Sequence, residues 1–406
     1  MPVYGFGVSV ISAMLLCCVV TSVSAQNAQP VAEGRALEEA RSLAEAGRVA
    51  EAERDLQSAA ALYPGSYLVH NDLGTLYLQT HRNGEALREF SLAARLNPHQ
   101  ADVQRNLGTC YFIRNDYSHA IEPLELAETL DPNDLRTRYQ LGYALLMLGR
   151  AREAEFQLKS VSDQMPDDER VQFALIKTYQ AERDQDKAAS VFSRLQQAHP
   201  NSAFVHILLG EAYDIQGRYS DAVSEYQKAL EQAPEMPRLH FDLGFLYFKQ
   251  DMAQKAAQAL KEELRVNPSF APALYYLGEI ALEENDLDRA IAFFQRALKE
   301  NPSCLDAYIG VGKALAGADR HRDAVAAFLR ANRLDDGMPD VHYMLAAEYR
   351  QLHEPEMQRQ ELERFKRLNA EAKSKPVSTG KPQARWEGTT CLTNEGSKRN
   401  HGIEAH

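Results

Sequence analysis

The sequence predicts an all-α protein built as a solenoid of stacked helix pairs. The first observation is a period of 34 residues: in steps of 34 through Gly74, seven of ten positions are Gly and two are Ala. The second is that Ala86 and Pro98 also recur at this step, and all three residue types stay in phase without an insertion. A fixed period of this length indicates supersecondary units that stack on one another.

Each unit contains two amphipathic helices, as residues 67–100 show. The first half has apolar residues at helical spacing at Leu73, Leu76 and Tyr77, and the second half has them at Ala86, Phe90 and Ala93. Between the halves lie turn-forming residues that tolerate a left-handed backbone, at Gly47, Asn115, Gly149, Gly217 and Asn285. The recurring proline ends the second helix. The recurring Gly or Ala lets two helix axes approach to about 8 Å.

These positions carry a resemblance to a known family. Leu73–Gly74, Tyr77, Ala86, Phe90, Ala93 and Pro98 resemble the tetratricopeptide repeat, a helix–turn–helix unit of 34 residues. The resemblance covers about ten units, from 33–66 to 339–372. It implies a superhelical solenoid of antiparallel helix pairs, but it says much less about function.

Composition favours a protein partner over nucleic acid. The formal net charge is −12, and charged residues make up 25% of the chain. Nucleic-acid affinity depends on Lys and Arg that neutralise phosphates, so an acidic solenoid disfavours DNA and RNA. It suits protein partners that are neutral, basic or locally matched in charge.

Residues 1–25 resemble a secretory signal peptide. An apolar run from Val8 to Val20 is too short to span a membrane comfortably, and small residues at Val23–Ala25 precede Gln26. The segment departs from a signal peptide because it has no Lys or Arg before the apolar run. We expect export to the periplasm or the medium after cleavage. An uncleaved membrane anchor, a lipoprotein signal at Cys17 and a wrongly assigned start remain open alternatives.

The expected organisation has four parts. Residues 1–25 form the signal peptide, 26–32 a linker, 33–372 the repeat solenoid and 373–406 a disordered tail. The first and last units are degenerate, as terminal caps of solenoids are. In the fifth unit Ile176 replaces the glycine, which we expect to open that helix crossing slightly.

The sequence offers no catalytic, metal or cofactor site. After removal of the signal peptide Cys110, Cys304 and Cys391 remain, and they share neither metal-like nor disulfide-like spacing, so we expect no dependence on disulfides. His353–Glu354 begins like a zinc-protease motif but lacks the second His. We therefore expect no enzyme activity, cofactor or metal.

Four histidines share one repeat position, namely His70, His206, His240 and His342. We interpret them as half-buried packing residues, because a metal ion would need ligands that converge on one point.

The expected binding surface is the inner stripe, defined as repeat positions two, five, nine and twelve of the first helix in each unit. In tetratricopeptide proteins this helix lines the concave groove that binds peptides or partner helices. The stripe is rich in aromatic residues, at Tyr139, Tyr143, Phe173, Phe204, Phe241, Phe245, Phe248 and Tyr275. Arginines lie at its edge, at Arg105, Arg136, Arg170 and Arg238. Aromatic residues with Arg are typical of interfaces, although the rings could instead pack between units.

The sequence thus predicts a non-catalytic scaffold that binds a peptide or partner protein through its concave groove. The alternative is an accessory arm of a cell-envelope assembly, secretion or polysaccharide-export machine whose enzyme is a separate chain. We expect no nucleic acid as a partner. Contact with a membrane is expected only if the N-terminal segment is kept as an anchor.

Overall fold

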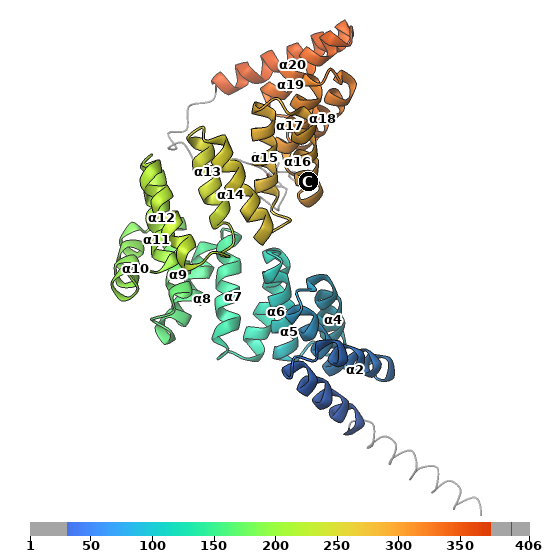
Figure 1. The fold of residues 1–406 in the computed structure, drawn as a ribbon, viewed down its shortest axis with the longest axis vertical. Helices are drawn as coiled ribbons and strands as arrows, with labels where there is room; N and C mark the ends of the chain where they lie inside the picture. Colours follow the sequence, from blue (N-terminus) through green and yellow to red (C-terminus); the bar gives the residue numbers. More distant parts are fainter. Residues whose placement is uncertain (1–30, 375–390, 392–406) are drawn as a thin grey trace, which may run out of the picture. The chain divides into compact units, whose positions relative to one another are not determined.

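The computed structural model describes residues 31–374 and Cys391, and these residues contain no β-strand. They divide into two compact units: unit 1 comprises the described residues up to Ala198, and unit 2 those from His199 onward. Within each unit, consecutive helices pack in pairs (Figure 1). The predicted all-α solenoid of helix pairs is confirmed.

Unit 1 starts with a helix over 31–45. Its further helices are α2 (Val49–Leu62), α3 (Tyr67–Gln79), α4 (Asn83–Leu96), α5 (Ala101–Ile113), α6 (Tyr117–Leu130), α7 (Leu135–Met147), α8 (Ala151–Gln164), α9 (Glu169–Ala181) and α10 (Gln185–Ala198). Unit 2 contains α11 (Ala203–Ile215), α12 (Tyr219–Gln232), α13 (Leu239–Lys249), α14 (Ala253–Val266), α15 (Ala271–Glu283), α16 (Leu287–Glu300), α17 (Leu305–Gly317), α18 (His321–Leu334), α19 (Pro339–Gln351) and α20 (Pro355–Ser374).

The observed helices differ from the predicted boundaries at two places. The first described helix includes Val31, which the sequence assigned to the linker, and α20 continues to Ser374, two residues into the predicted tail. The predicted signal peptide 1–25 lies outside the described residues, as does the predicted tail except for its helical start and Cys391. These two segments therefore stay predictions.

The recurring glycine packs against a large side chain sixteen residues later, on the second helix of the same pair. A Cβ atom added at Gly278 would lie 2.6 Å from Cε1 of Phe294, closer than real Cβ contacts. The same crossing joins Gly74 to Phe90, Gly108 to Leu124, Gly142 to Leu158, Gly210 to Tyr226, Gly244 to Leu260 and Gly312 to Phe328. The rings of Phe90, Phe294 and Phe328 are almost completely buried at these crossings. The small residue is thus what lets the two helices of a pair enclose a large side chain.

The fifth pair, α9 and α10, shows what happens without the glycine. Ile176 occupies the small-residue position and is itself buried. Phe192, sixteen residues later, is only half-buried. The large side chain of this pair is thus less buried than Phe90, Phe294 and Phe328, and the expected opening of the crossing stays a prediction.

Each helix pair is joined by a tight turn with one residue in the left-handed region. Positive φ angles recur every 34 residues, at Gly47, His81, Asn115, Gly149, Arg183, Gly217, Asp251, Asn285, Asp319 and His353. The sequence identified only the Gly and Asn copies of this turn. The copies with other residues also have a positive φ, because each turn is closed by the same backbone hydrogen bond. At His81, for example, the N–H of Arg82 donates to the carbonyl of Tyr77 at 2.8 Å.

Helix α13 begins differently from the other first helices. Arg238 has a φ of 70°, and Glu263 from α14 accepts hydrogen bonds from the backbone N–H groups of Arg238 at 3.1 Å and Phe241 at 3.3 Å. Glu263 has no exposed surface, although Ala occupies its repeat position in most other units. Burial of the carboxylate raises its pKa, because a charge in the protein interior loses its hydration. The side chain of one helix thus caps the start of the other.

The first prediction concerns the glycine crossing. Gly278→Ala should destabilise the α15–α16 pair by about 1–3 kcal/mol, because the new methyl group collides with the ring of Phe294. Units of a solenoid couple mainly to their neighbours, so hydrogen exchange should rise in α15–α17 and stay unchanged in α3–α6. Gly84→Ala is the matched control, because nothing lies within 4 Å of a Cβ there. Equal losses for the two variants would contradict this packing.

The second prediction concerns pH. The raised pKa of Glu263 means that the folded chain binds more protons than the unfolded chain above the unfolded value of about 4.3. Stability of the wild type should therefore rise, relative to Glu263→Gln, as the pH falls from 7 to about 5. Hydrogen exchange of α13 and α14 at both pH values measures this difference. Parallel changes in the two proteins would show that Glu263 does not titrate with folding.

Candidate functional site

Aromatic residues of the inner stripe in unit 1 form a group with one ring from a second helix, Tyr117 of α6. We define the aromatic cluster as Phe112 of α5, Tyr117 of α6, and Tyr139 and Tyr143 of α7. Phe112 contacts Tyr143 edge-on with centroids 5.5 Å apart, and Tyr139 lies 6.2 Å from Tyr143. Tyr117 contacts both Phe112 and Tyr143. All four side chains are half-buried, so each ring packs on its neighbours and still presents part of its surface.

Tyr139 keeps its phenol proton at neutral pH. Burial raises its pKa to about 12, since the phenolate would lose hydration. The guanidinium of Arg170 lies 5.9 Å from the ring centroid. A neutral phenol next to a cation offers a hydrogen-bond donor and an apolar ring face at the same place.

The arginines of the stripe differ in their availability. Arg105 forms ion pairs with Asp102 and, at 3.2 Å, with Asp134. Arg170 binds Asp168 at 2.6 Å, and this hydrogen bond lowers the pKa of that carboxyl. Arg136 is exposed, and none of the described residues forms an ion pair with it. Arg136 is therefore the stripe arginine best placed to meet a carboxylate from outside.

Two of the predicted stripe residues in unit 2 are buried, unlike those of the aromatic cluster. Phe241 and Phe245 are 1% and 5% exposed and belong to the core between α13 and α15. Phe241 contacts Phe270 edge-on at 5.2 Å, and Tyr276 lies 5.1 Å from Phe245. The interpretation of these two phenylalanines as exposed groove residues is therefore corrected: a ligand cannot reach their rings without displacing core side chains.

The difference in burial between the stripe rings of α7 and those of α13 comes from the helix pair that follows each of them. Tyr139 and Tyr143 of α7 occupy the same repeat positions as Phe241 and Phe245 of α13. After α13, Phe270 and Tyr276 pack on the rings of Phe241 and Phe245. The equivalent positions after α7 hold Asp168 and Ala174. Two bulky aromatic residues thus close the stripe in unit 2, and two smaller residues leave it partly open in unit 1.

The remaining predicted residues fall between these cases. Phe173, Phe204, Phe248 and Tyr275 are half-buried. Phe248 and Tyr275 both contact the ring of Tyr276, at 5.2 and 5.1 Å. Arg238 is half-buried at the start of α13 rather than on an open edge. Partner binding through these residues stays a prediction.

The shared histidine position has a structural use. Nδ1 of His70 lies 2.7 Å from the carboxylate of Glu89, and His206 and His342 make the same contact with Glu225 and Glu361 at 2.6 and 2.5 Å. Nε2 of His70 faces the carbonyl of Pro64, just as the amide of Gln104 donates to the carbonyl of Pro98. These side chains tie the first helix to its partner helix and to the preceding loop. The described residues contain no group of His, Cys, Asp and Glu arranged for a metal ion.

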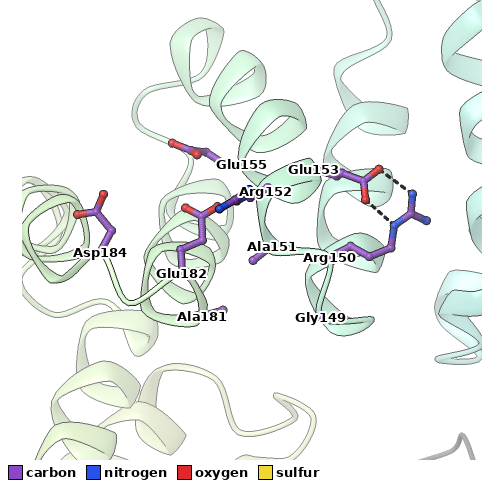
Figure 2. Close-up of a pocket in the computed structure, with 9 residues that line it drawn as sticks. All are labelled: Gly149, Arg150, Ala151, Arg152, Glu153, Glu155, Ala181, Glu182 and Asp184. Carbon is purple, nitrogen blue, oxygen red and sulfur yellow. Dashed lines mark hydrogen bonds and ion pairs between the residues drawn. The ribbon is translucent and has the colours of Figure 1, made fainter. Parts of the chain in front are cut away.

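A cavity of about 800 Å³ opens at the turns of two successive pairs in unit 1 (Figure 2). Residues 149–153, Glu155, Ala181, Glu182 and Asp184 line it, and they include no Ser, Thr, Cys or His. The guanidinium of Arg150 binds Glu153 at 2.7 Å, and Glu155 binds Lys187 at 3.0 Å. Arg150 and Glu153 thus pair within the lining, Glu155 pairs with a lysine outside it, and the lining residues offer no nucleophile.

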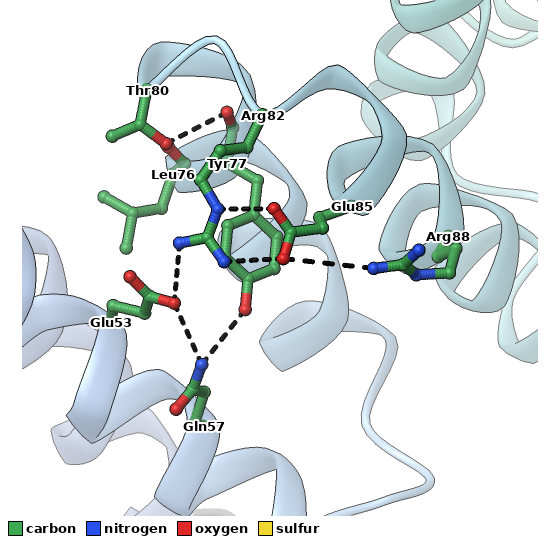
Figure 3. Close-up of polar contacts among 8 residues, drawn as sticks. All are labelled: Glu53, Gln57, Leu76, Tyr77, Thr80, Arg82, Glu85 and Arg88. Carbon is green, nitrogen blue, oxygen red and sulfur yellow. Dashed lines mark hydrogen bonds and ion pairs between the residues drawn. The ribbon is translucent and has the colours of Figure 1, made fainter.

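The arginine–carboxylate pair of this cavity recurs as a structural element. Figure 3 shows the copy at Arg82, the residue before α4. Its guanidinium binds Glu85 of α4 and, at 2.8 Å, Glu53 of α2. The guanidinium lies 4.3 Å from the ring centroid of Tyr77, whose hydroxyl accepts a hydrogen bond from Gln57 at 3.1 Å. Similar pairs start other second helices, at Arg48–Glu51, Arg218–Asp221 and Arg320–Asp323. Arg82 also joins its pair to the preceding one through Glu53, whereas the other three pairs lie at the start of a single helix. We therefore assign these arginines to the fold.

None of the helices in the described part of the chain is long and apolar enough to span a membrane. The N-terminal apolar run lies outside that part.

Comparisons with solved structures find other helical repeat proteins. The APC/C hetero-tetramer Cut9–Hcn1 matches with 14% identity and a TM-score of 0.53, over 82% of this chain and 86% of that chain. MamA matches with 20% identity and a TM-score of 0.40, over 41% of this chain and 98% of MamA. IFIT1 with Gppp-AAAA matches with 18% identity and a TM-score of 0.47, over 81% and 79%. At these identities the likeness to Cut9–Hcn1 concerns the fold alone.

Comparisons of sequence identify the repeat itself. A search of curated proteins found no match. Models of the tetratricopeptide repeat match residues 37–94, 71–134, 111–177, 170–202, 241–303 and 281–348, and a model described as a TPR repeat matches 210–251. These matches cover most of the chain and agree with the period, the glycine crossings and the turns, so the chain belongs to the tetratricopeptide repeat family.

Proposed function

We propose that this protein is an exported scaffold that binds a partner protein through the aromatic cluster of unit 1. The observation that carries the proposal is the half-exposed cluster with Arg136 beside it on the inner stripe. Tetratricopeptide repeats generally mediate protein–protein interactions, which supports a protein as the partner.

The chemistry of the cluster defines the segment that it would bind. Its ring faces suit an apolar or aromatic side chain of the partner, since such contacts carry much of the energy of interfaces. Arg136 suits a carboxylate on the same segment. The arginines that are already paired with Asp residues would contribute less, because the partner would have to compete with an existing ion pair.

Export is the second part of the proposal. It is supported by the apolar run Val8–Val20 with small residues at Val23–Ala25. A disulfide between Cys304 and Cys391 adds to this support, because disulfides persist mainly in oxidising compartments outside the cytosol.

The third prediction tests the cluster. Replacing Tyr139 and Tyr143 together by Ala should weaken partner binding about tenfold or more, since each decade corresponds to about 1.4 kcal/mol and central rings often contribute more. The partner is first captured with the full chain from native extract, and its affinity for each variant is then measured by calorimetry.

Phe156→Ala is the matched control, because this ring is 71% exposed on α8, the second helix of the same pair. It should leave the affinity unchanged. Thermal unfolding of each variant separates lost binding from lost folding. If the double variant binds like the wild type, or if Phe156→Ala loses equal affinity, the aromatic cluster is not the binding site.

The fourth prediction tests export. N-terminal sequencing of the protein from its native host should begin at Gln26. Recovery from the cytoplasmic fraction with Met1 intact would contradict export, and an intact N-terminus in the membrane fraction would indicate an anchor.

A further inference from the structure

Two cysteines far apart in the sequence meet in unit 2. Cys304 and Cys391 form a disulfide, with their Cα atoms 4.4 Å apart and a separation of 87 residues in the sequence. The cysteine spacing did not indicate this pair, because a separation of this length carries no spacing signal. The disulfide is thus a feature that the sequence did not predict, and the expectation that the chain does not depend on disulfides is tested by the experiment below.

The disulfide lies in the hydrophobic core of unit 2. Cys304 is fully buried, Cys391 is 3% exposed, and both belong to the core cluster that includes Leu305 and Phe328. The buried side-chain amide of Asn301 donates a hydrogen bond to the carbonyl of Cys391 at 3.2 Å. Cys391 is thus held by packing and by a hydrogen bond in addition to the covalent bond.

The bond closes a loop that contains the last four helices, α17 to α20. No α-helix follows α20 in the described residues, and among them the last pair has a neighbouring pair on one side only. Such terminal units are the weak point of a solenoid. The last unit also departs from the repeat, since Gln358 replaces the recurring alanine. A covalent loop lowers the conformational entropy of the unfolded segment and so favours its folded state.

We propose that the Cys304–Cys391 disulfide is a redox-dependent staple that stabilises the C-terminal helix pairs of unit 2. It forms when the two thiols pass two electrons and two protons to an external protein disulfide, which leaves as a dithiol. A small dithiol such as dithiothreitol reverses the exchange and is itself oxidised to a cyclic disulfide. The inference stands apart from the proposed binding site, which lies in unit 1.

Cys110 does not compete in this exchange. It lies fully buried in α5 of unit 1, and burial raises the pKa of its thiol, which keeps it in the unreactive protonated form.

The experiment uses the full chain, oxidised and after treatment with dithiothreitol. Peptide mapping without reductant should recover the residues around Cys304 linked to those around Cys391. Hydrogen exchange in α17–α20 should become about tenfold faster or more after reduction, which corresponds to about 1.4 kcal/mol per decade. Exchange in α3–α8 should not change.

Cys304→Ser is the decisive variant. Serine retains the helix cap, because Ser66 and Ser202 cap α3 and α11 at the same repeat position. The variant should behave like the reduced wild type, and dithiothreitol should have no further effect on it. Cys110→Ala is the control and should keep the full response to dithiothreitol. Free thiols at both positions in the oxidised protein, or unchanged exchange in α17–α20 after reduction, would overturn the proposal.

Discussion

The contact between a small residue on one helix and a large side chain on its partner is the constraint on which this structure depends. It fixes the distance between the two helices of a pair, because a Cβ at Gly312 or Gly278 would collide with the ring of Phe328 or Phe294. Repetition of the contact at constant spacing makes successive pairs alike. Where Ile176 replaces the glycine, Phe192 on the partner helix is only half-buried.

Polar side chains then determine how one pair joins the next. The contacts of Arg82 with Glu53 and of Gln57 with Tyr77 cross from one pair to its neighbour. His70 and Gln104 reach back to the loop that precedes their helices. Arg82 and Glu53 are partly exposed, and a single ion pair in such a setting contributes little to stability. Their contribution is to orientation, since each satisfies backbone or side-chain groups that only one arrangement of neighbouring pairs brings together.

Binding capacity on such a scaffold depends on what the next pair leaves uncovered. Tyr139 and Phe241 hold equivalent positions, yet the former is half-buried and the latter 1% exposed. Phe270 and Tyr276 account for the difference by packing on the ring of Phe241. At these equivalent positions, the exposure of a ring therefore depends on the side chains that the following pair places against it. This difference favours unit 1 for the candidate site and assigns Phe241 and Phe245 to the core.

The sequence by itself determined the fold class, the period, the helix pairs and the glycine crossings, because these depend on contacts within one unit that recur in every copy. It also identified Tyr139 and Tyr143 as site candidates, but it predicted Phe241 and Phe245 as site residues in the same way. Only the tertiary structure separated them, since burial of a ring depends on residues about thirty positions away in the next pair. The meeting of Cys304 with Cys391 and the capping of α13 by Glu263 were likewise decided by tertiary structure. Each arises once, between residues distant in sequence, and a repeat pattern carries no signal for a contact that does not repeat.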